Sequence, residues 1–308
     1  MTISYINVEE TYKIILEEGN YTLVDTLPEE HFVQVHLPEA LNICVYNASF
    51  SQQVAELLPE QEKFIIVYGS SDRTRTALFA AEKMIRAGYS RVFVLQGGLE
   101  SWRQANYPLS GEATEAEFVS ADSLEISDGA YTLNPEQSSI QWKGRNHNSS
   151  HYGTVDCLAG DFTTSSKAFT GSLSVAMDSI KNTNLQGDEL QPVLEAHLKS
   201  DDFFFVNRYK TATLTIHEGR MTSSPILTQK NCVVQGDLTL RGKTKDIQFE
   251  ATLAPDADGN LLLEAHFDLD RTRWNIIYGS ARFFDFLGMH QVFDDISLEL
   301  RLKLEKIR

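Results

Sequence analysis

The chain has 308 residues and a formal net charge of −16, from 27 lysine and arginine residues against 43 aspartate and glutamate residues. This length suggests two domains, each able to bury a core of its own. The acidic balance and the lack of any run of basic residues argue against a nucleic-acid partner and against adsorption to an anionic membrane surface.

The three cysteines, Cys44, Cys157 and Cys232, are far apart in the sequence. Their odd number and wide spacing fit neither a disulfide framework nor a zinc site and are typical of a reducing compartment. The first residues lack the basic start and apolar stretch of a signal peptide, and no apolar run reaches transmembrane length. We therefore expect a soluble, cytoplasmic protein with no integral membrane segment.

Strand and helix signals alternate over residues 1–112. Helical spacing of apolar residues predicts a first helix over residues 8–18, a second over 75–87 and a last one carrying Trp102. Short apolar runs predict strands over residues 21–25, 40–45, 64–68 and 91–95. This alternation is typical of an α/β domain with a mostly parallel sheet.

A polar loop between the strand 64–68 and the helix after it is where we expect chemistry. Backbone N–H groups at a helix N-terminus favour an anion, and the two arginines of this loop add positive charge. The loop is therefore a candidate oxyanion-binding or partner-docking site, and the alternative is a loop that binds nothing. Its residues are Gly69, Ser70, Ser71, Asp72, Arg73, Thr74 and Arg75.

Several motifs in order make residues 1–112 resemble the rhodanese family. They are Leu23-Val24-Asp25, the stretch 30–40, and Leu95-Gln96-Gly97-Gly98-Leu99 followed by Trp102. Rhodaneses place a nucleophilic cysteine first in the polar loop to carry sulfur as a persulfide, and this chain has Gly69 at that position. The resemblance therefore implies a rhodanese-like domain without sulfurtransferase activity, which could dock a protein partner.

An enzymatic alternative uses another cysteine for sulfur transfer or thiol chemistry. Cys44 is the candidate in the first domain, but its neighbours are apolar. Reactive thiols need an accessible, electropositive setting, so a buried structural thiol is the favoured interpretation. Beyond this domain, residues 113–128 are predicted to be a linker, because the stretch 110–117 is small, polar and acidic.

Strand signals recur over residues 129–308 with turn signals between them and no long helix. The alternating segments are 138–143, 171–177, 212–217, 237–240, 246–250, 265–269 and 296–304. In the last segment Ser297, Glu299, Arg301 and Lys303 are expected to face solvent. This pattern predicts an antiparallel sandwich or barrel, and the length suits a single calyx.

One aromatic corner dominates this half. Residues 193–199 have helical spacing, Ser200 and the Asp pair after it offer turn chemistry, and Phe203, Phe204 and Phe205 follow. In an extended chain adjacent side chains point to opposite faces, so both sides of this corner are expected to be apolar. The corner is either an ordinary part of a core or one wall of an elongated apolar cavity.

The motifs of residues 129–308 resemble the YceI family, lipocalin-like barrels associated with binding polyisoprenoid lipids. They are Tyr131-Thr132-Leu133-Asn134, Met177-Asp178-Ser179-Ile180, the stretch 197–204, the hairpin 236–245, and Asp270-Arg271-Thr272-Arg273-Trp274. The resemblance implies an antiparallel β-barrel that holds an apolar, isoprenoid-type lipid, with no other cofactor. The aromatic segment 275–293 is expected to form a lid or mouth.

Aromatic residues of this half are the candidates for contact with the lipid. They are Trp142, Phe162, Phe203, Phe204, Phe205, Phe267, Trp274, Tyr278, Phe283, Phe284 and Phe286. Arg145, His147 and His151 are candidates for a polar head group. The two histidines lie in a loop-like stretch, so no metal site is expected, and no catalytic triad stands out. The remaining alternative is an interaction scaffold with a filled core and no cavity.

Overall fold

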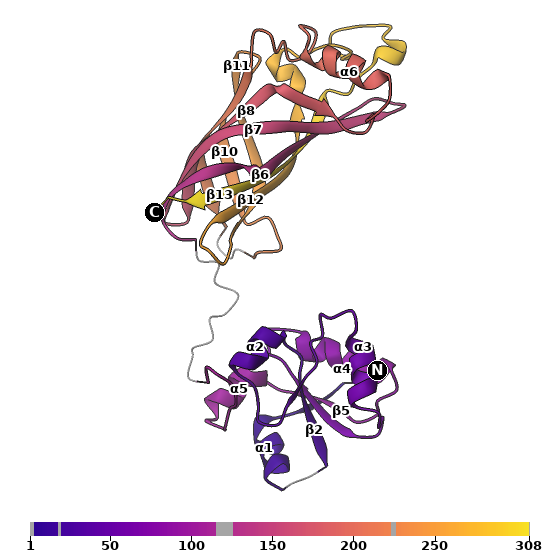
Figure 1. Ribbon diagram of the computed structural model, residues 1–308, viewed down its shortest axis with the longest axis vertical. Helices are drawn as coiled ribbons and strands as arrows, with labels where there is room; N and C mark the ends of the chain where they lie inside the picture. The colour runs from indigo at the N-terminus through magenta and orange to yellow at the C-terminus, as the bar shows by residue number, and fades with distance from the viewer. Residues whose placement is uncertain (1–2, 18–19, 115–125, 223–225, 308) are drawn as a thin grey trace. The chain divides into compact units, whose positions relative to one another are not determined.

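The computed structural model describes residues 3–17, 20–114, 126–222 and 226–307. The chain divides into two compact units, Met1–Phe118 and Val119–Arg308 (Figure 1). Residues 115–125 of the predicted linker lie outside the described residues. Across the described ranges, no helix is both long enough and apolar enough to cross a membrane.

The amino-terminal unit contains one parallel five-stranded sheet. Its strands lie in the order β1-β5-β4-β2-β3. Their bounds are β1 (Ser4–Ile6), β2 (Tyr21–Asp25), β3 (Leu41–Asn42), β4 (Phe64–Tyr68) and β5 (Val92–Leu95). Strand β4 lies in the middle of the sheet and is covered on both faces, which explains its continuous apolar run.

Helices cover both faces of this sheet, as expected for an α/β domain. They are α1 (Val8–Leu16), α2 (Glu29–Gln34), α3 (Phe50–Leu57), α4 (Thr76–Arg86) and α5 (Gly98–Gln104). Because side chains alternate along a strand, Ile65 and Val67 pack with α3 and α4, whereas Ile66 and Tyr68 pack with α1 and α5. The predicted strand over 40–45 was too long, since the sheet takes only β3 from it.

The carboxy-terminal unit is a closed barrel of antiparallel strands in the order β10-β11-β12-β13-β6-β7-β8-β9, with β9 paired to β10. The first four strands are β6 (Gly129–Arg145), β7 (Ser150–Ser165), β8 (Ala168–Asn182) and β9 (Thr211–Met221). The others are β10 (Cys232–Leu240), β11 (Lys243–Pro255), β12 (Leu261–Asp270) and β13 (Asp295–Lys306). The predicted barrel is confirmed.

One end of the barrel is packed solid. The ring of Phe162 lies over Gly171, where an added Cβ would come within 2.6 Å of the ring, and the ring of Phe169 lies over Gly219, at 2.2 Å by the same measure. Large rings fill the space that glycines leave on neighbouring strands, so this end is closely packed around Phe162 and Phe169. Strand β6 begins and β13 ends here (Figure 1).

The other end is covered by helix α6 (Leu190–Lys199), the turn after it, and residues 271–293 with the short helices η1 (Arg271–Trp274) and η2 (Gly288–His290) (Figure 1). The aromatic corner 203–205 is a turn and not a strand, so strand alternation does not set the directions of its side chains. Phe205 has a φ of 48°, and its N–H donates to the carbonyl of Ser200 at 2.7 Å.

Candidate functional site

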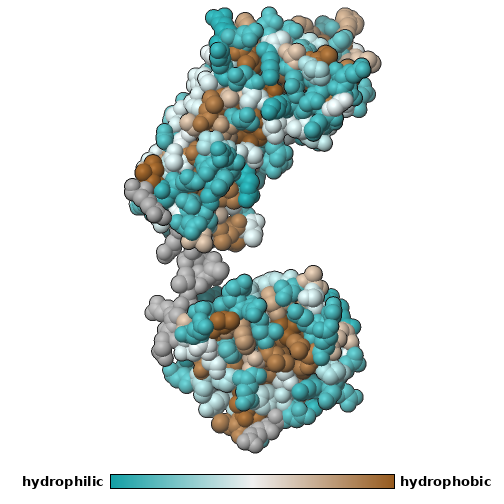
Figure 2. Space-filling view, in the orientation of Figure 1, coloured by the Kyte–Doolittle hydropathy of each residue, from teal (hydrophilic) through white to brown (hydrophobic). Residues whose placement is uncertain are grey.

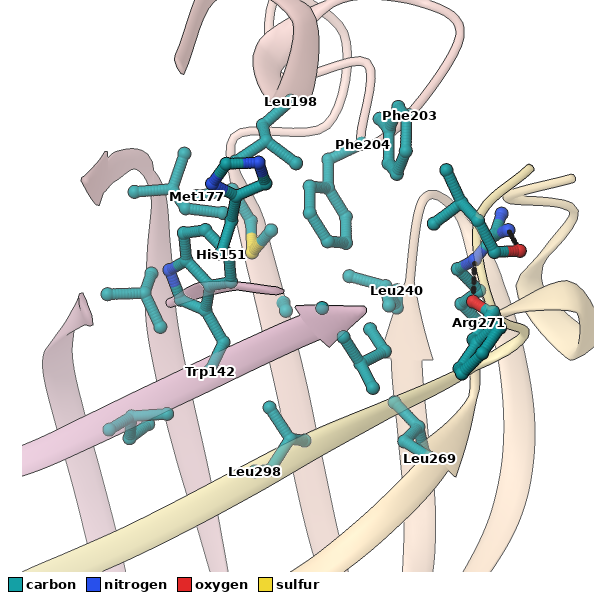
Figure 3. Close-up of a pocket in the computed structure, with 18 of the residues that line it drawn as sticks. Trp142, His151, Met177, Leu198, Phe203, Phe204, Leu240, Leu269, Arg271 and Leu298 are labelled. Atoms are coloured by element: carbon teal, nitrogen blue, oxygen red, sulfur yellow. Dashed lines mark hydrogen bonds between the residues drawn. The ribbon is translucent and has the colours of Figure 1, made fainter. Parts of the chain in front are cut away.

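The half of the barrel under α6 holds a cavity of about 330 Å³. Its wall is mainly aliphatic and draws on both sides of the barrel, for example Leu173, Met177, Leu214, Leu240 and Leu298. Figure 3 shows Trp142 and His151 on one wall, Arg271 on the opposite one, and Leu198, Phe203 and Phe204 toward α6. The cavity volume lies at the lower end of the range for small-molecule sites.

The structure brings together five of the aromatic residues that the sequence nominated. Trp142, Phe203, Phe204, Phe267 and Tyr278 all line the cavity. The indole of Trp142 is held in place because its Nε1 donates to the carbonyl of Thr154 at 3.3 Å. Phe203 and Phe204 reach the cavity from the turn after α6, so the corner does form part of its wall.

The other nominated aromatics do not line the cavity. Phe162 belongs to the packed end, and Trp274 is fully buried with its Nε1 donating to the carbonyl of Leu238 at 2.9 Å. Phe205 packs edge-on against Tyr209, with ring centroids 6.0 Å apart. The remaining three, Phe283, Phe284 and Phe286, are exposed to solvent. Residue type alone did not distinguish these positions from the five that line the cavity.

Glycines on β6 and β7 shape the wall around Trp142. Trp142 pairs with Gly153 and Gly144 pairs with His151, so each large side chain faces a residue without one. A Cβ added at Gly153 would lie 1.8 Å from the carbonyl oxygen of Lys181, whereas one at Gly144 meets no atom within 4 Å. The position of Gly144 is therefore open to the cavity that it lines.

Two of the three head-group candidates line the cavity. Strand β7 begins at Ser150, so His151 lies in a strand and not in a loop, contrary to the expectation from sequence. Its Nδ1 is buried and has no hydrogen-bond partner in the part of the chain that the structure describes. His147 lies outside the lining, and its ring packs edge-on against Phe293 at 5.1 Å.

Arg145 is the second head-group candidate on the lining. Its Nη2 donates to the hydroxyl of Ser297 at 2.5 Å, and that hydroxyl in turn donates to Asp268. Ser297 is buried, so the expectation that it faces solvent was wrong. The hydroxyl of Ser297 thus bridges Arg145 and Asp268. These hydrogen bonds explain how a polar side chain of β13 can be buried away from water.

Arg271 is a buried cation on the cavity wall to which the sequence analysis assigned no role. Its guanidinium donates to three carbonyl groups, those of Ile276 at 2.5 Å, Val292 at 3.0 Å and Phe293 at 3.1 Å. Burial lowers the pKa of Arg271, and the nearby Asp294 opposes that shift. The motif Asp270-Arg271 resembles a family feature. The carbonyl groups that Arg271 binds lie up to 22 residues away in the sequence, so no local pattern predicts these contacts.

Further ring side chains meet beside Arg271. The ring of His197 packs edge-on against Tyr278 at 4.6 Å and against Phe203 at 5.1 Å. The hydroxyl of Tyr278 lies 3.3 Å from Nδ1 of His290. All of these residues line the cavity, so its end toward α6 is more polar than its floor.

The polar loop of the amino-terminal unit is bonded mainly to itself, to Gly97 and to the first turn of α5. Asp72 accepts from the N–H of Gly97 at 2.6 Å, and Arg73 pairs with Glu100 at 3.5 Å. A Cβ added at Gly69 would lie 2.0 Å from Oγ1 of Thr76, so the threonine hydroxyl occupies the space of a side chain at position 69. Arg75 lines a shallow cavity of about 450 Å³ beside Tyr46 and Phe79.

The thiols offer no accessible nucleophile. Cys44, Cys157 and Cys232 are all unpaired and buried. Burial raises the pKa of Cys157 and of Cys232 to about 11, so these two are protonated at neutral pH. Within the described ranges, no group of three or more histidine, cysteine, aspartate or glutamate residues is placed to hold a metal ion.

In the comparisons with known proteins, each of the two units matches a different set of proteins. The thiosulfate sulfurtransferase GlpE of Actinobacillus pleuropneumoniae serotype 3 is 25% identical over 108 residues, which are 35% of this chain and 94% of that protein. The crystal structure of BcnA from Burkholderia cenocepacia is similar at 15% identity and a TM-score of 0.39, over 56% of this chain and 98% of that one.

A polyisoprenoid binding domain from Saccharophagus degradans is similar at 15% identity and a TM-score of 0.40, over 57% of this chain and 98% of that one. The model of the rhodanese-like domain matches residues 7–105. The model of the YceI-like domain matches residues 131–304, which is more than half of the 308 residues. The chain therefore belongs to the YceI-like family and carries a rhodanese-like domain ahead of its barrel.

Proposed function

We propose that the barrel binds an apolar lipid of the isoprenoid type, with the hydrocarbon chain in the cavity under α6. The observation that carries this proposal is a cavity with a mainly aliphatic and aromatic wall, in a barrel that is closely packed at its other end. Burial of a flexible hydrocarbon contributes about 25 cal/mol per Å² removed from water and needs no exact hydrogen-bond geometry. Resemblance of the barrel motifs to a family of polyisoprenoid-binding proteins supports the isoprenoid class.

The polar head of the lipid is proposed to meet Arg145 and His151. The unpaired Nδ1 of His151 is the supporting observation, because a buried polar atom without a partner costs free energy that a ligand hydrogen bond would recover. Neutral imidazole offers one donor and one acceptor nitrogen, and arginine offers donors only. An alcohol, a carbonyl or a phosphate would each satisfy this pair.

Mass spectrometry of organic extracts of the purified protein tests the proposal directly. An isoprenoid lipid at near-stoichiometric occupancy is the expected result. Purified protein stripped of lipid should also bind a fluorescent apolar probe, and farnesol should displace the probe. A barrel that contains no extracted lipid and is indifferent to the probe would support the scaffold alternative instead.

The rhodanese-like domain is proposed to act without sulfur transfer, as a docking or oxyanion-binding module. Gly69 has no side chain to carry a persulfide, and the buried thiols argue against a substitute. Assay of thiosulfate:cyanide sulfurtransferase activity should give no turnover above background, and turnover would overturn this part of the proposal. If titration with phosphate or sulfate leaves the melting temperature of this domain unchanged, the oxyanion role is excluded and docking remains.

A further inference from the structure

The rim of the barrel carries apolar side chains that the cavity does not enclose. We name as the rim patch the exposed residues Phe283, Phe284, Phe286, Met289 and Phe293. Phe286 is fully exposed and Met289 is 85% exposed. Single exposed apolar residues are ordinary, but these five lie within eleven positions of one segment at the end of the barrel that holds the cavity.

The rim patch is continuous with the cavity. Met289 and Phe293 are both exposed and part of the cavity lining, so an apolar surface runs from inside the barrel to its outer face. Helix α6, at the same end, adds the exposed side chains of Leu190 and Val193. In Figure 2 brown and tan atoms lie among teal ones at this end of the barrel.

The charges near the rim patch indicate what kind of surface the patch can bind. Residues 275–293 hold one arginine and one aspartate, in a chain whose net charge is −16. Arg282 is already paired with Asp270 at 2.8 Å and with Asp294 at 3.0 Å. No unpaired cation is therefore offered by this segment to an anionic partner, and the acidic chain would be repelled by one.

The conformation of Phe286 is costly in the isolated chain. Its φ of 55° lies in the left-handed region, which a bulky residue seldom adopts, and its side chain has no buried contact to offset that cost. Insertion of the ring into an apolar phase would provide the missing contact. Phenylalanine is well suited to the boundary between head groups and acyl chains.

We propose that the rim patch inserts into the interface of a zwitterionic bilayer, so that a lipid passes between membrane and cavity without crossing water. This inference rests on the proposed lipid-binding function. The bilayer is the favoured occupant because the patch is apolar and leads into the cavity, and because the charged residue exposed within it, Asp285, is an anion that would repel an anionic partner. A second copy of the chain is the competing occupant and is an outcome of the test.

Flotation of the full-length protein with phosphatidylcholine vesicles is the experiment. We expect Phe283→Ser/Phe286→Ser to lower the vesicle-bound fraction at least about tenfold, because neither ring can then enter the interface. Leu158→Ser is the matched control, since it removes an exposed apolar side chain from the wall of the barrel, and its flotation should equal that of the wild type. Binding of the fluorescent probe in vesicle-free solution should be unchanged in the double variant.

Four results would overturn the inference. They are wild-type protein that does not float, a double variant that floats like wild type, binding that requires anionic lipid and vanishes in high salt, and a dimer in light scattering that the same substitutions abolish without any flotation. Flotation without probe binding would contradict the proposed function but not the docking surface. Probe binding without flotation would contradict only the docking surface.

Discussion

Gly144 is the residue at which the hollow interior can be tested most directly. A side chain added there points into the open cavity and meets no atom within 4 Å of its Cβ. We expect Gly144→Leu to lower affinity for the apolar probe at least about tenfold while leaving the free energy of unfolding within about 1 kcal/mol of wild type. Displacement titration and urea unfolding measure the two quantities.

The matched control for Gly144 is Gln141→Leu, which adds the same side chain to the exposed face of the same strand. Its affinity for the probe should equal that of the wild type. Equal binding by Gly144→Leu would show that ligands do not occupy this part of the barrel. The pair of variants therefore separates occupation of the cavity from a general effect of added apolar surface.

His151 tests the proposed head-group contact. Substitution His151→Phe removes the unpaired ring nitrogen but keeps an aromatic side chain on the wall. We expect the affinity for farnesol to fall about three- to tenfold, the cost of one lost hydrogen bond, with no fall for a hydrocarbon such as farnesene. Competition against the fluorescent probe gives both affinities, and His147→Phe, outside the lining, is the control.

Asp25 is a buried carboxyl at the end of β2 whose ionisation opposes folding. Burial raises its pKa to about 6, although its Oδ1 accepts from the N–H of Leu27 at 2.8 Å. Because the folded pKa lies above the unfolded one, the stabilising contribution is present at acidic pH and is lost as pH rises through 6. Above pH 7 the buried carboxyl of Asp25 is ionised, which lowers the free energy of unfolding.

We therefore expect Asp25→Asn to stabilise the amino-terminal unit by about 1–3 kcal/mol at pH 8, the upper value corresponding to two pKa units. The gain should shrink toward zero below about pH 3, where the wild-type carboxyl is protonated in both the folded and the unfolded state. Urea unfolding at both pH values measures it. Glu62→Gln at an exposed turn is the control, and a gain that does not depend on pH would contradict the burial argument.

At the scale of elements, Arg271 fastens residues 275–293 over the end of the barrel. Removal of its guanidinium leaves the carbonyls of Ile276, Val292 and Phe293 without their donor. We expect Arg271→Met to lower the free energy of unfolding of the barrel by about 2–4 kcal/mol. Hydrogen exchange should also become faster over residues 276–293.

Arg282→Met is the matched control for Arg271. It removes an arginine from the same rim, but one whose side chain is 58% exposed, so its ion pairs should contribute less than about 1 kcal/mol. Equal destabilisation by the two substitutions would mean that charge and not the three buried carbonyl contacts holds the segment. Urea unfolding of both variants in the same buffer gives the comparison.

Strand bounds were predicted best where local pattern and burial agree. Both β2 and β4 match their apolar runs from end to end, because central strands of a parallel sheet are buried on both faces. Strand β7 was missed entirely, and its first residues were taken for a loop because His151 follows Asn146 and Ser149 closely in the sequence. In the structure only residues 146–149 turn, with Asn146 accepting from the N–H groups of Asn148 and Ser149.

For the whole molecule, the two units have separate cores. Buried residues of the barrel form one cluster, and those of the amino-terminal unit form two others on the faces of its sheet. We expect calorimetry of the full-length protein to resolve two transitions. A bound isoprenoid at about 100 times its Kd should stabilise only the barrel, by about 2.7 kcal/mol.

The control for this experiment is Gly144→Leu, in which a tenfold weaker Kd should reduce the stabilisation of the barrel by the same lipid concentration to about 1.4 kcal/mol or less. A lipid that raises both melting temperatures of the wild type equally would indicate that the ligand couples the two units. A lipid that raises only the transition of the amino-terminal unit would contradict the proposed site. Substitution Asp25→Asn assigns the amino-terminal transition independently, because it changes only that unit.

The sequence by itself determined the fold class of each unit and the absence of a thiol at position 69. Period-2 alternation and apolar runs are local properties, so they can be recognised in the sequence without knowledge of the tertiary contacts. The tertiary structure alone decided which aromatics face a cavity and which fill a core. Phe162 and Phe203 are the same residue type, and only closure of the barrel places one over Gly171 and the other beside open space. The space next to an inward-facing side chain is filled or left open by residues far away in the sequence. No local sequence pattern could therefore predict which half of the barrel contains the cavity.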